Sequence, residues 1–425
     1  MPGYVIGYDL NDLVSQITLS ELNANVLQTI NLDAKDERLG IPTVLCKRNG
    51  VNQWYYGNEA EAVAGRKEGT LVGKLISFAK AGAKLEIEGE AYDPVDLLIL
   101  FVRRSLNLII SRVNPDDIKQ LTITVEELDD KMISLLNRIT GEIRIAKDRI
   151  VFQTYDESIY YYVLHQPEDL YEHDVIVLDY ANDYLKCYEL RMNRHTTPIV
   201  GFVDKTEFKD IKLPQFMIER ELSEEKYERL DELIMQTLRE ALSGSAISSI
   251  FLIGDGFDSS WCDKTLRFLT FGRRVFQGKN LYSKGACYCS ADKVLPKAIN
   301  ARYIFLGHDK LKGNTGLKMR VKGKEEYVVL VDAGETWYSS SNTLEFIIEK
   351  GRDVTILVTP LDGSKQREEV IDLPGLPTRP ERASRLRLEA TFASDTMMHV
   401  VVTDLGFGEF YLSSGKTWEK DISLV

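Results

Sequence analysis

The chain has 425 residues, too many for a single hydrophobic core, so its length predicts between two and four domains. Its formal net charge of −12 argues against nucleic acid and against an anionic membrane as partners, because both require a basic surface. Apolar residues make up 44% of the chain, and the longest strongly apolar run, residues 97–102, is far shorter than the roughly 20 residues of a membrane-spanning helix.

The cysteines and histidines do not show the spacing of a metal site. Cys287 and Cys289 are one residue apart, whereas zinc-binding pairs are separated by two to four residues and accompanied by a second pair. The histidines are scattered singly along the chain. Because a strand pattern starts almost at the first residue, we expect no signal peptide. We therefore expect a cytoplasmic protein with reduced thiols and no metal held by His or Cys.

The first expected element is a strand pair at residues 4–19. An apolar strand leads through Gly7 to Asp9, and the chain turns over Asn11 and Asp12 before a second apolar strand. Asn and Asp suit this turn because they tolerate the left-handed backbone region and hydrogen-bond their own main chain. The pattern predicts a β-hairpin whose first strand ends in a carboxylate.

Strands alternate with helices up to about residue 165, which indicates an α/β domain. Asp93 is the expected N-cap of a long apolar helix, and Pro94 takes its first position, where the missing N–H costs nothing. This helix is expected to end near Val113. The other expected elements are strands at 42–47, 53–56, 120–125 and 149–152 and helices at 128–139 and 156–164.

The first hairpin pattern returns at residues 175–190. Asp179 ends an apolar strand there, and Asn182 and Asp183 form the turn. Two copies of the same hairpin, one in each half, predict a duplicated, two-lobed fold with a cleft between the lobes. We expect Asp9 and Asp179 to face that cleft.

The second half then shows a helix and a strand with clear signals. Ser223 is the expected N-cap of an amphipathic helix that ends at Gly244, and acidic residues in the first turn complement the helix dipole. A buried strand at 249–253 ends in a turn that contains Gly254, Asp255 and Gly256.

Near residue 310 the pattern changes to short alternating runs separated by Gly, Pro, Asp and Ser. This pattern is typical of a β-sandwich. We expect a linker at 307–316 and a sandwich at 317–425. The expected strands are 317–321, 327–331, 343–348, 354–358, 386–391, 398–403 and 409–412.

The order of these elements resembles the seventy-kilodalton heat-shock chaperones, in which an actin-like ATPase domain precedes a peptide-binding β-sandwich. The most specific stretch is 371–410, which is similar to a loop of that sandwich and the two strands after it. The other motifs that carry the resemblance are YVIGYDL (4–10), WYYGNEAEA (54–62), YDPVDLLILFVRRSL (92–106), LTITVEELDDKMISLL (121–136), VIVLDYAND (175–183), FLIGDGFDSSW (251–261) and FQGKNLYSKGACYCSA (276–291).

The resemblance implies an actin-like domain at 1–306, with lobe I at about 1–170 and a reduced lobe II at about 171–306, followed by a sandwich without a helical lid. It also implies ATP or ADP with Mg²⁺ between the hairpins, a peptide or protein client and a possible co-chaperone. Asp9 and Asp179 would be the catalytic carboxylates. The implied nucleotide-binding residues are Asn11, Asp12, Leu13, Lys74, Asn182, Asp183, Gly254, Asp255 and Gly256. The implied peptide-binding residues are Val331, Trp337, Tyr338 and Phe346.

The phosphate-binding positions depart from the family. The first hairpin carries Asn11, Asp12 and Leu13 where the family has Gly and Thr, and the second hairpin lacks the family's glycine-rich run. Phosphoryl transfer depends on backbone N–H groups, hydroxyls and a cation around the phosphates, so added carboxylates oppose it. The position of the family's catalytic lysine falls on Gly73, or on Lys74 after a shift of one residue.

The sequence therefore predicts a divergent chaperone-like protein whose nucleotide site is weak, altered or lost. An active ATPase with unorthodox phosphate loops is the alternative, and an actin-like assembly scaffold without catalysis is a third reading. Purely structural roles also explain the singled-out residues. In that reading Asp9 and Asp179 shape their hairpins, Gly254 and Gly256 permit a tight turn, and the aromatic residues near 337 belong to the sandwich core.

Overall fold

The computed structural model divides into two compact units, Met1–Tyr303 (unit 1) and Ile304–Val425 (unit 2). Among the described residues, no helix is both long and apolar enough to cross a membrane. The structure describes residues 3–22, 24, 26–31, 39–181, 184–194, 198–212, 224–257, 261–307, 310–321, 323–338, 340–361 and 365–425.

Unit 1 contains two sheets whose strands follow the same order. The order is β11-β10-β1-β2-β3 in lobe I and β16-β15-β12-β13-β14 in lobe II. In each lobe an antiparallel hairpin is flanked by two parallel strands. The strands of lobe I are β1 (Tyr4–Asp9), β2 (Val14–Glu21), β3 (Leu27–Thr29), β10 (Ile118–Val125) and β11 (Ile150–Thr154). Those of lobe II are β12 (Asp174–Asp179), β13 (Tyr184–Asn193), β14 (Ile199–Lys212), β15 (Ile247–Ile253) and β16 (Arg274–Gly278).

The two hairpins also share their register. Asp9 lies opposite Gln16 in the first hairpin, and Asp179 lies opposite Lys186 in the second, so both loops have the same length. Each aspartate ends a central strand of its sheet. The duplication that the sequence predicts therefore places the two carboxylates at equivalent positions.

The long apolar helix α3 (Pro94–Ile110) begins where the sequence supplies a cap. The Asp93 side chain accepts a hydrogen bond from the Val95 N–H at 2.8 Å, and Pro94 takes the first helical position, as predicted. The predicted cap at Ser223 lies outside the described residues. The helices are α1 (Gly57–Gly65), α2 (Leu75–Ala81), α3 (Pro94–Ile110), α4 (Asp130–Thr140), α5 (Tyr155–Leu164), α6 (Glu224–Ala241), α7 (Asp263–Thr270), α8 (Leu281–Val294) and α9 (Ala298–Arg302).

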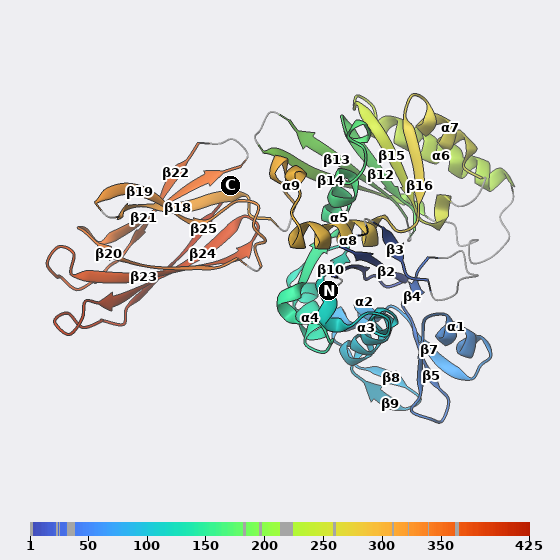
Figure 1. Ribbon diagram of the computed structural model, residues 1–425, viewed down its shortest axis with the longest axis horizontal. Coiled ribbons are helices and arrows are strands. Elements are labelled where there is room, and N and C mark those ends of the chain that lie inside the picture. Colours follow the sequence, from blue (N-terminus) through green and yellow to red (C-terminus); the bar gives the residue numbers. More distant parts are fainter. Residues whose placement is uncertain are drawn as a thin grey trace. The chain divides into compact units, whose positions relative to one another are not determined.

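Helices α5 and α8 cross between the two sheets (Figure 1). A Cβ on Gly285 of α8 would lie 2.0 Å from the Ser158 carbonyl oxygen of α5, and a Cβ on Gly7 of β1 would lie 2.1 Å from the Ser283 carbonyl oxygen of α8. Only glycine permits such close backbone approaches. Ser290 of α8 also donates a hydrogen bond to the Ile6 carbonyl at 2.9 Å. Lobe II thus packs a helix directly onto the sheet of lobe I.

Smaller elements complete unit 1. Helix α1 packs against a small sheet in the order β6-β5-β7, and β8 and β9 form a hairpin before α3. These strands are β4 (Ile41–Pro42), β5 (Leu45–Arg48), β6 (Trp54–Tyr56), β7 (Gly69–Val72), β8 (Leu85–Ile87) and β9 (Glu90–Tyr92). Short 3₁₀ helices lie at Pro115–Asp117, Lys147–Arg149, Glu168–Leu170 and Asp255–Phe257, and β17 (Tyr303–Phe305) spans the division between the units.

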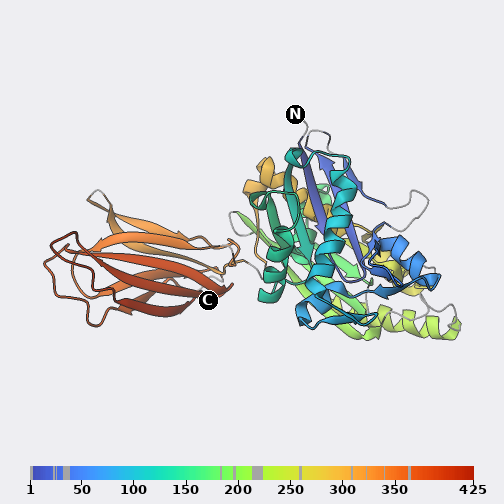
Figure 2. The ribbon, with the colours of Figure 1, turned by 90° about the horizontal axis from the view of Figure 1, so that it is seen from below.

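In the described part of unit 2, two antiparallel sheets of four strands face each other around one hydrophobic core (Figure 2). The first has the order β19-β18-β21-β22 and the second β20-β23-β24-β25. The strands are β18 (Gly313–Val321), β19 (Lys324–Val331), β20 (Asn342–Ile348), β21 (Asp353–Pro360), β22 (Arg367–Asp372), β23 (Ser384–Ser394), β24 (Met397–Gly406) and β25 (Thr417–Ser423).

The strand prediction for this region is wrong in one place and incomplete in two. Residues 409–412 form a loop, because the chain turns at Gly406 and Gly408, which have positive φ angles. Strands β22 and β25 were not predicted. Their exposed faces carry charged side chains, so their alternation is less apolar than that of the other strands.

Candidate functional site between the lobes

A cavity of about 200 Å³ lies between the two hairpins of unit 1. Both predicted carboxylates, Asp9 and Asp179, line it, as does Asp255 from the turn after β15. Two tyrosines at the starts of α5 and α8 also face it. The lining residues are Asp9, Asn11, Leu13, Val14, Gln16, Leu39, Tyr155, Asp179, Ala181, Ile253, Gly254, Asp255, Lys279 and Tyr282.

Asp9 is held by a tyrosine of its own lobe. The Tyr155 hydroxyl donates a hydrogen bond to Asp9 Oδ1 at 2.7 Å, and Asp9 is only 3% exposed. Burial raises the pKa of Asp9 to about 7, and the nearby charge of Asp179 adds to this rise. Asp9 is therefore partly protonated near neutral pH.

Asp179 is held in the same way in lobe II. The Tyr282 hydroxyl donates to Asp179 Oδ2 at 2.7 Å, and the Ala181 N–H donates to Oδ1 at 3.0 Å. Asp179 is 4% exposed, and burial raises its pKa as well. Each lobe thus pairs its strand-end aspartate with a tyrosine from the start of a helix.

The two tyrosine rings stack on each other across the lobes. The centroids of Tyr155 and Tyr282 are 3.8 Å apart, and the ring planes differ by 9°. An aromatic pair of this kind contributes roughly 0.5–1.5 kcal/mol beyond its buried area. We call the chain of contacts Asp9–Tyr155–Tyr282–Asp179 the tyrosine bridge. It joins the two hairpins beside the cavity.

The tyrosine bridge was not predicted from the sequence. Tyr155 was expected just before a helix, and Tyr282 lies in a stretch matched to the family only as a helix. The signal was available in the duplication, because both tyrosines belong to the first turn of the helix that follows the last parallel strand of their lobe.

The first hairpin loop forms the turn that its sequence predicts. Asn11 Oδ1 accepts hydrogen bonds from the N–H groups of Leu13 and Val14, both at 2.9 Å. Asn11 Nδ2 donates to the Tyr155 hydroxyl at 3.4 Å. Asn11 and Leu13 both line the cavity, as expected for residues of this loop.

Asp12 points away from the cavity toward α2. Its carboxylate accepts hydrogen bonds from the Ile76 N–H at 2.7 Å and from the N–H and hydroxyl of Ser77. A carboxylate at a helix N-terminus satisfies orphan N–H groups and complements the dipole. Asp12 therefore caps α2 and does not line the cavity, although the family resemblance implies a phosphate-binding role for it.

Lys74 and Gly256, two other predicted nucleotide-binding residues, do not line the cavity. Lys74 is exposed, has a φ of +52° and is not among the lining residues. Gly256 lies under the ring of Tyr180, where a Cβ would come within 2.4 Å of that ring. Asn182 and Asp183 lie outside the described residues.

The glycine turn after β15 packs on the second hairpin. Gly254 has a φ of +96°, and a Cβ there would lie 2.4 Å from the Ala181 nitrogen. The buried Tyr180 ring fills the space beside Gly256, and its hydroxyl donates to the Lys212 carbonyl at 2.8 Å. From this turn Gly254 and Asp255 reach the cavity. The glycines of this turn thus allow it to pack closely against the second hairpin.

Ionic contacts join the lobes near the cavity. Glu126 of lobe I accepts hydrogen bonds from Lys186 and, at 2.9 Å, from Lys205, both of lobe II. Burial raises the pKa of Glu126, but the two ammonium groups outweigh it and hold the pKa below its usual range. Among the described residues, no group of three or more His, Cys, Asp or Glu is placed to hold a metal ion.

Three of the four predicted peptide-binding residues of unit 2 lie in or against its core. Val331 is buried in that core, and Trp337 and Phe346 pack against it while staying partly exposed. The rings of Trp337 and Tyr338 meet edge to face at 5.7 Å. Val331 is therefore a core residue and is not exposed to a peptide.

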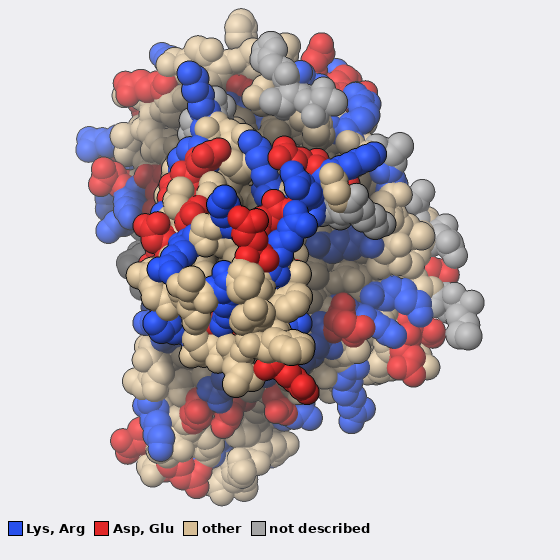
Figure 3. Space-filling view, turned by 90° about the vertical axis from the view of Figure 1, so that its left-hand side faces the viewer, with Lys and Arg blue, Asp and Glu red and all other residues tan. Residues whose placement is uncertain are grey.

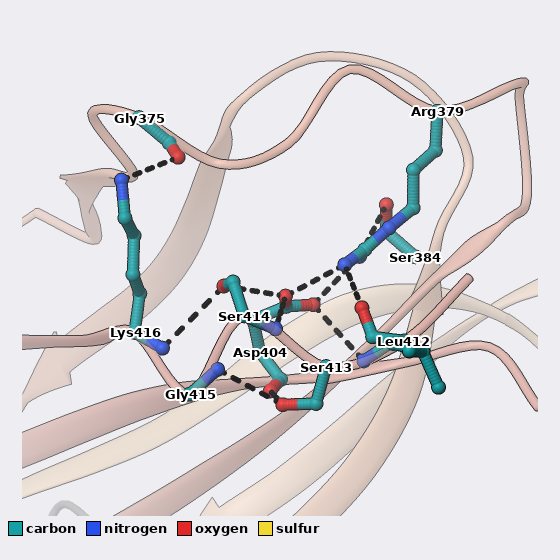
Figure 4. A network of polar contacts seen from close by, with 10 residues as sticks. Gly375, Arg379, Ser384, Asp404, Leu412, Ser413, Ser414, Gly415 and Lys416 are labelled. Carbon is teal, nitrogen blue, oxygen red and sulfur yellow. Dashed lines mark hydrogen bonds and ion pairs between the residues drawn. The ribbon is translucent and has the colours of Figure 1, made fainter.

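A buried ion pair stabilises one end of unit 2. Arg379 donates to both carboxylate oxygens of Asp404, at 2.7 and 2.8 Å, and holds the pKa of Asp404 well below its usual range. Figure 4 shows Ser414 reaching the same carboxylate, with a hydroxyl bond of 2.7 Å. The adjoining loop leaves Phe410 92% and Leu412 77% exposed.

On the face seen in Figure 3, basic and acidic side chains are interleaved.

Two comparisons with known proteins bear on the chain. A family model described as "Family of unknown function (DUF5716) C-terminal" matches residues 27–308. A second model, described as "Domain of unknown function (DUF8552)", matches residues 310–424. No curated protein matches the chain.

Proposed function

The chain belongs to the DUF5716 family, whose function is unknown, and we propose that it is a divergent chaperone-like protein that binds a peptide or protein client through unit 2 without an ATP cycle. In this proposal unit 1 has an actin-like fold and unit 2 is a β-sandwich. The repeated strand order of the two lobes and the helices α5 and α8 between them support the first assignment. The two facing sheets of unit 2 support the second.

The observation that carries the proposal is the tyrosine bridge. A nucleotide needs room for its phosphates between the hairpins, together with backbone N–H groups and a cation. Here two buried carboxylates and two stacked rings lie between the hairpins. The cavity of about 200 Å³ is also smaller than the roughly 300–1,000 Å³ typical of pockets for drug-sized ligands. These features oppose the binding of a triphosphate.

The edge of unit 2 supports the binding of an extended peptide. Among the described strands, β20 pairs only with β23, so it is an edge strand of its sheet. Its inward side chains Leu344, Phe346 and Ile348 are only partly buried. An extended peptide can add to such an edge through main-chain hydrogen bonds and place its apolar side chains beside these residues.

Calorimetric titration with Mg-ATP and Mg-ADP tests the loss of the nucleotide site. We expect no binding at nucleotide concentrations up to about 1 mM. A dissociation constant of about 1 mM corresponds to a binding free energy of roughly −4 kcal/mol. Micromolar binding of Mg-ATP, with turnover that Asp9→Asn abolishes, would contradict the proposal. Asp210 is an exposed aspartate of β14, so Asp210→Asn is the control for the change of charge.

An active ATPase is the second candidate, because Asp9 and Asp179 end equivalent strands and line one cavity. Two carboxylates in this arrangement are suited to holding a hydrated magnesium ion. The same titration and turnover measurements separate the two candidates.

The cysteines are buried and form no disulfide, which supports a cytoplasmic location.

A further inference from the structure

We propose that the cavity beside the tyrosine bridge binds a small organic cation, an amine or guanidine with an apolar body. The inference deepens the proposed function and rests on it, since it assigns a different class of ligand to a cleft that has lost its nucleotide. Three properties of the cavity support it: the charge of its lining, the character of its walls and its size.

The charge of the lining favours a cation. Asp9, Asp179 and Asp255 contribute three carboxylates to the described lining, which also includes the basic residue Lys279. An anionic phosphate would face repulsion from these carboxylates, whereas an ammonium or guanidinium group would be attracted to them. The lining therefore favours a positively charged ligand over a negatively charged nucleotide.

The buried carboxylates are held by neutral donors. Tyr155 and Tyr282 donate hydroxyl hydrogen bonds to Asp9 and Asp179, and Ala181 donates its backbone N–H. Lys186 lowers the pKa of Asp179, but burial outweighs this effect. A cation in the cavity would supply countercharge to two carboxylates whose present partners do not offset the cost of burial.

The walls and the size indicate the rest of the ligand. The aliphatic side chains of the lining come from both lobes, and Leu13 and Val14 of the first hairpin are 49% and 41% exposed. An apolar body of the ligand would cover these side chains and remove them from water. A volume of about 200 Å³ admits a small molecule of this kind. The aliphatic part of the lining favours an organic cation over a bare metal ion, because only an organic ligand has an apolar body to place against it.

Titration of the full chain with phenethylamine tests the inference. The matched probe phenylacetate has a similar shape and the opposite charge. We expect phenethylamine to raise the unfolding temperature and to bind at least about tenfold more tightly than phenylacetate. Equal binding of the two probes would overturn the inference. So would the absence of any effect of phenethylamine or agmatine at about 10 mM.

Two variants locate the site. Asp255 is exposed and its carboxylate is not part of the tyrosine bridge, so Asp255→Asn should fold normally and weaken phenethylamine binding by at least about threefold. Asp210→Asn makes the same change of charge outside the cavity and should leave binding unchanged. Equal affinities of the wild-type chain and Asp255→Asn would contradict the assignment to this cavity.

The pH dependence gives an independent readout. Asp9, with its pKa of about 7, faces Tyr155, Asn11, Asp179 and Glu126. Cation binding should release protons and become tighter between about pH 6 and pH 8, as Asp9 loses its proton. Affinity that falls over this range would overturn the inference. Micromolar Mg-ATP binding would instead overturn the proposed function, while amine failure without ATP binding would overturn only this inference.

Discussion

Tyr155 and Tyr282 determine the chemistry of the interlobe cavity at the scale of single residues. Their hydroxyls donate to Asp9 and Asp179, and their rings stack across the lobes. The hydroxyl groups stabilise the carboxylates, but burial still raises the pKa of both. The arrangement therefore keeps two carboxylates in a site where their charged forms are costly.

The cost of the Asp9 charge should appear in the pH dependence of stability. The folded-state pKa of about 7 exceeds the ordinary value of 3.8, so the folded state binds more protons between these values. The free energy of unfolding should therefore fall as the pH rises from about 4 to about 7. Asp9→Asn removes this dependence and should stabilise unit 1 at about pH 8 by up to about 4 kcal/mol.

Urea denaturation at about pH 5 and pH 8 measures this difference. The variant and the wild-type chain should have similar stabilities at the lower pH and diverge at the higher one. Asp210→Asn should show no such divergence. A variant that is less stable than the wild-type chain at the higher pH would show that Asp9 is stabilised as a charge.

The Arg379–Asp404 pair provides the second prediction at the residue scale. Both side chains are nearly inaccessible, so removal of one leaves a buried charge without its partner. Arg379→Gln should destabilise unit 2 by about 3–5 kcal/mol in chemical denaturation. Arg382→Gln is the matched control, because Arg382 forms an exposed pair with Glu349 that should contribute less than about 1 kcal/mol. Similar losses for the two variants would contradict the prediction.

At the scale of elements, the crossing of α5 and α8 depends on glycine. Gly285→Ala would place a Cβ 2.0 Å from the Ser158 carbonyl oxygen, so the backbone of one helix must move. We expect a loss of about 3 kcal/mol or more in the free energy of unfolding. Gly65→Ala in α1 meets open space and should be neutral or stabilising. Thermal denaturation of both variants compares them, and a neutral Gly285→Ala would mean that the helices separate easily.

The elements could be predicted where a local signal sets them. The cap at Asp93 and the two hairpins were read correctly, because a few adjacent residues determine them. The loop at 409–412 was read as a strand, because its apolar residues alternate as they do in strands. Glycine turns and the contact of Arg379 with the Leu412 carbonyl hold it outside the sheets.

The candidate site could be predicted only in part for the same reason. Asp9 and Asp179 were found because each ends a strand in a repeated pattern. Tyr155 and Tyr282 were missed, because their contact joins segments far apart in the chain. The family resemblance implies a place in the site for Asp12, yet its carboxylate caps α2. This contact depends on the position of α2 in the fold, which the sequence around Asp12 does not determine.

At the scale of the whole molecule, the proposal predicts that client binding is independent of nucleotide. A labelled, extended apolar peptide should bind the full chain with the same affinity, within about twofold, in the presence and absence of Mg-ATP. Fluorescence anisotropy measures both values. A change of tenfold or more, about 1.4 kcal/mol of coupling, would show that the interlobe site and unit 2 communicate through nucleotide.

The packing of α8 also bears on synthesis of the protein. Helix α8 belongs to lobe II, but Ser290 bonds to Ile6 and Thr122 of the lobe I sheet, at 2.9 and 2.7 Å. A ribosome makes lobe I first, at roughly 5–20 residues per second. The face of β1 and β10 that α8 covers therefore waits for residues 281–294 to emerge. At this rate the stretch from the end of β10 to the end of α8 takes roughly 8–34 s to synthesise, and the nascent chain carries this surface uncovered by α8 during that time.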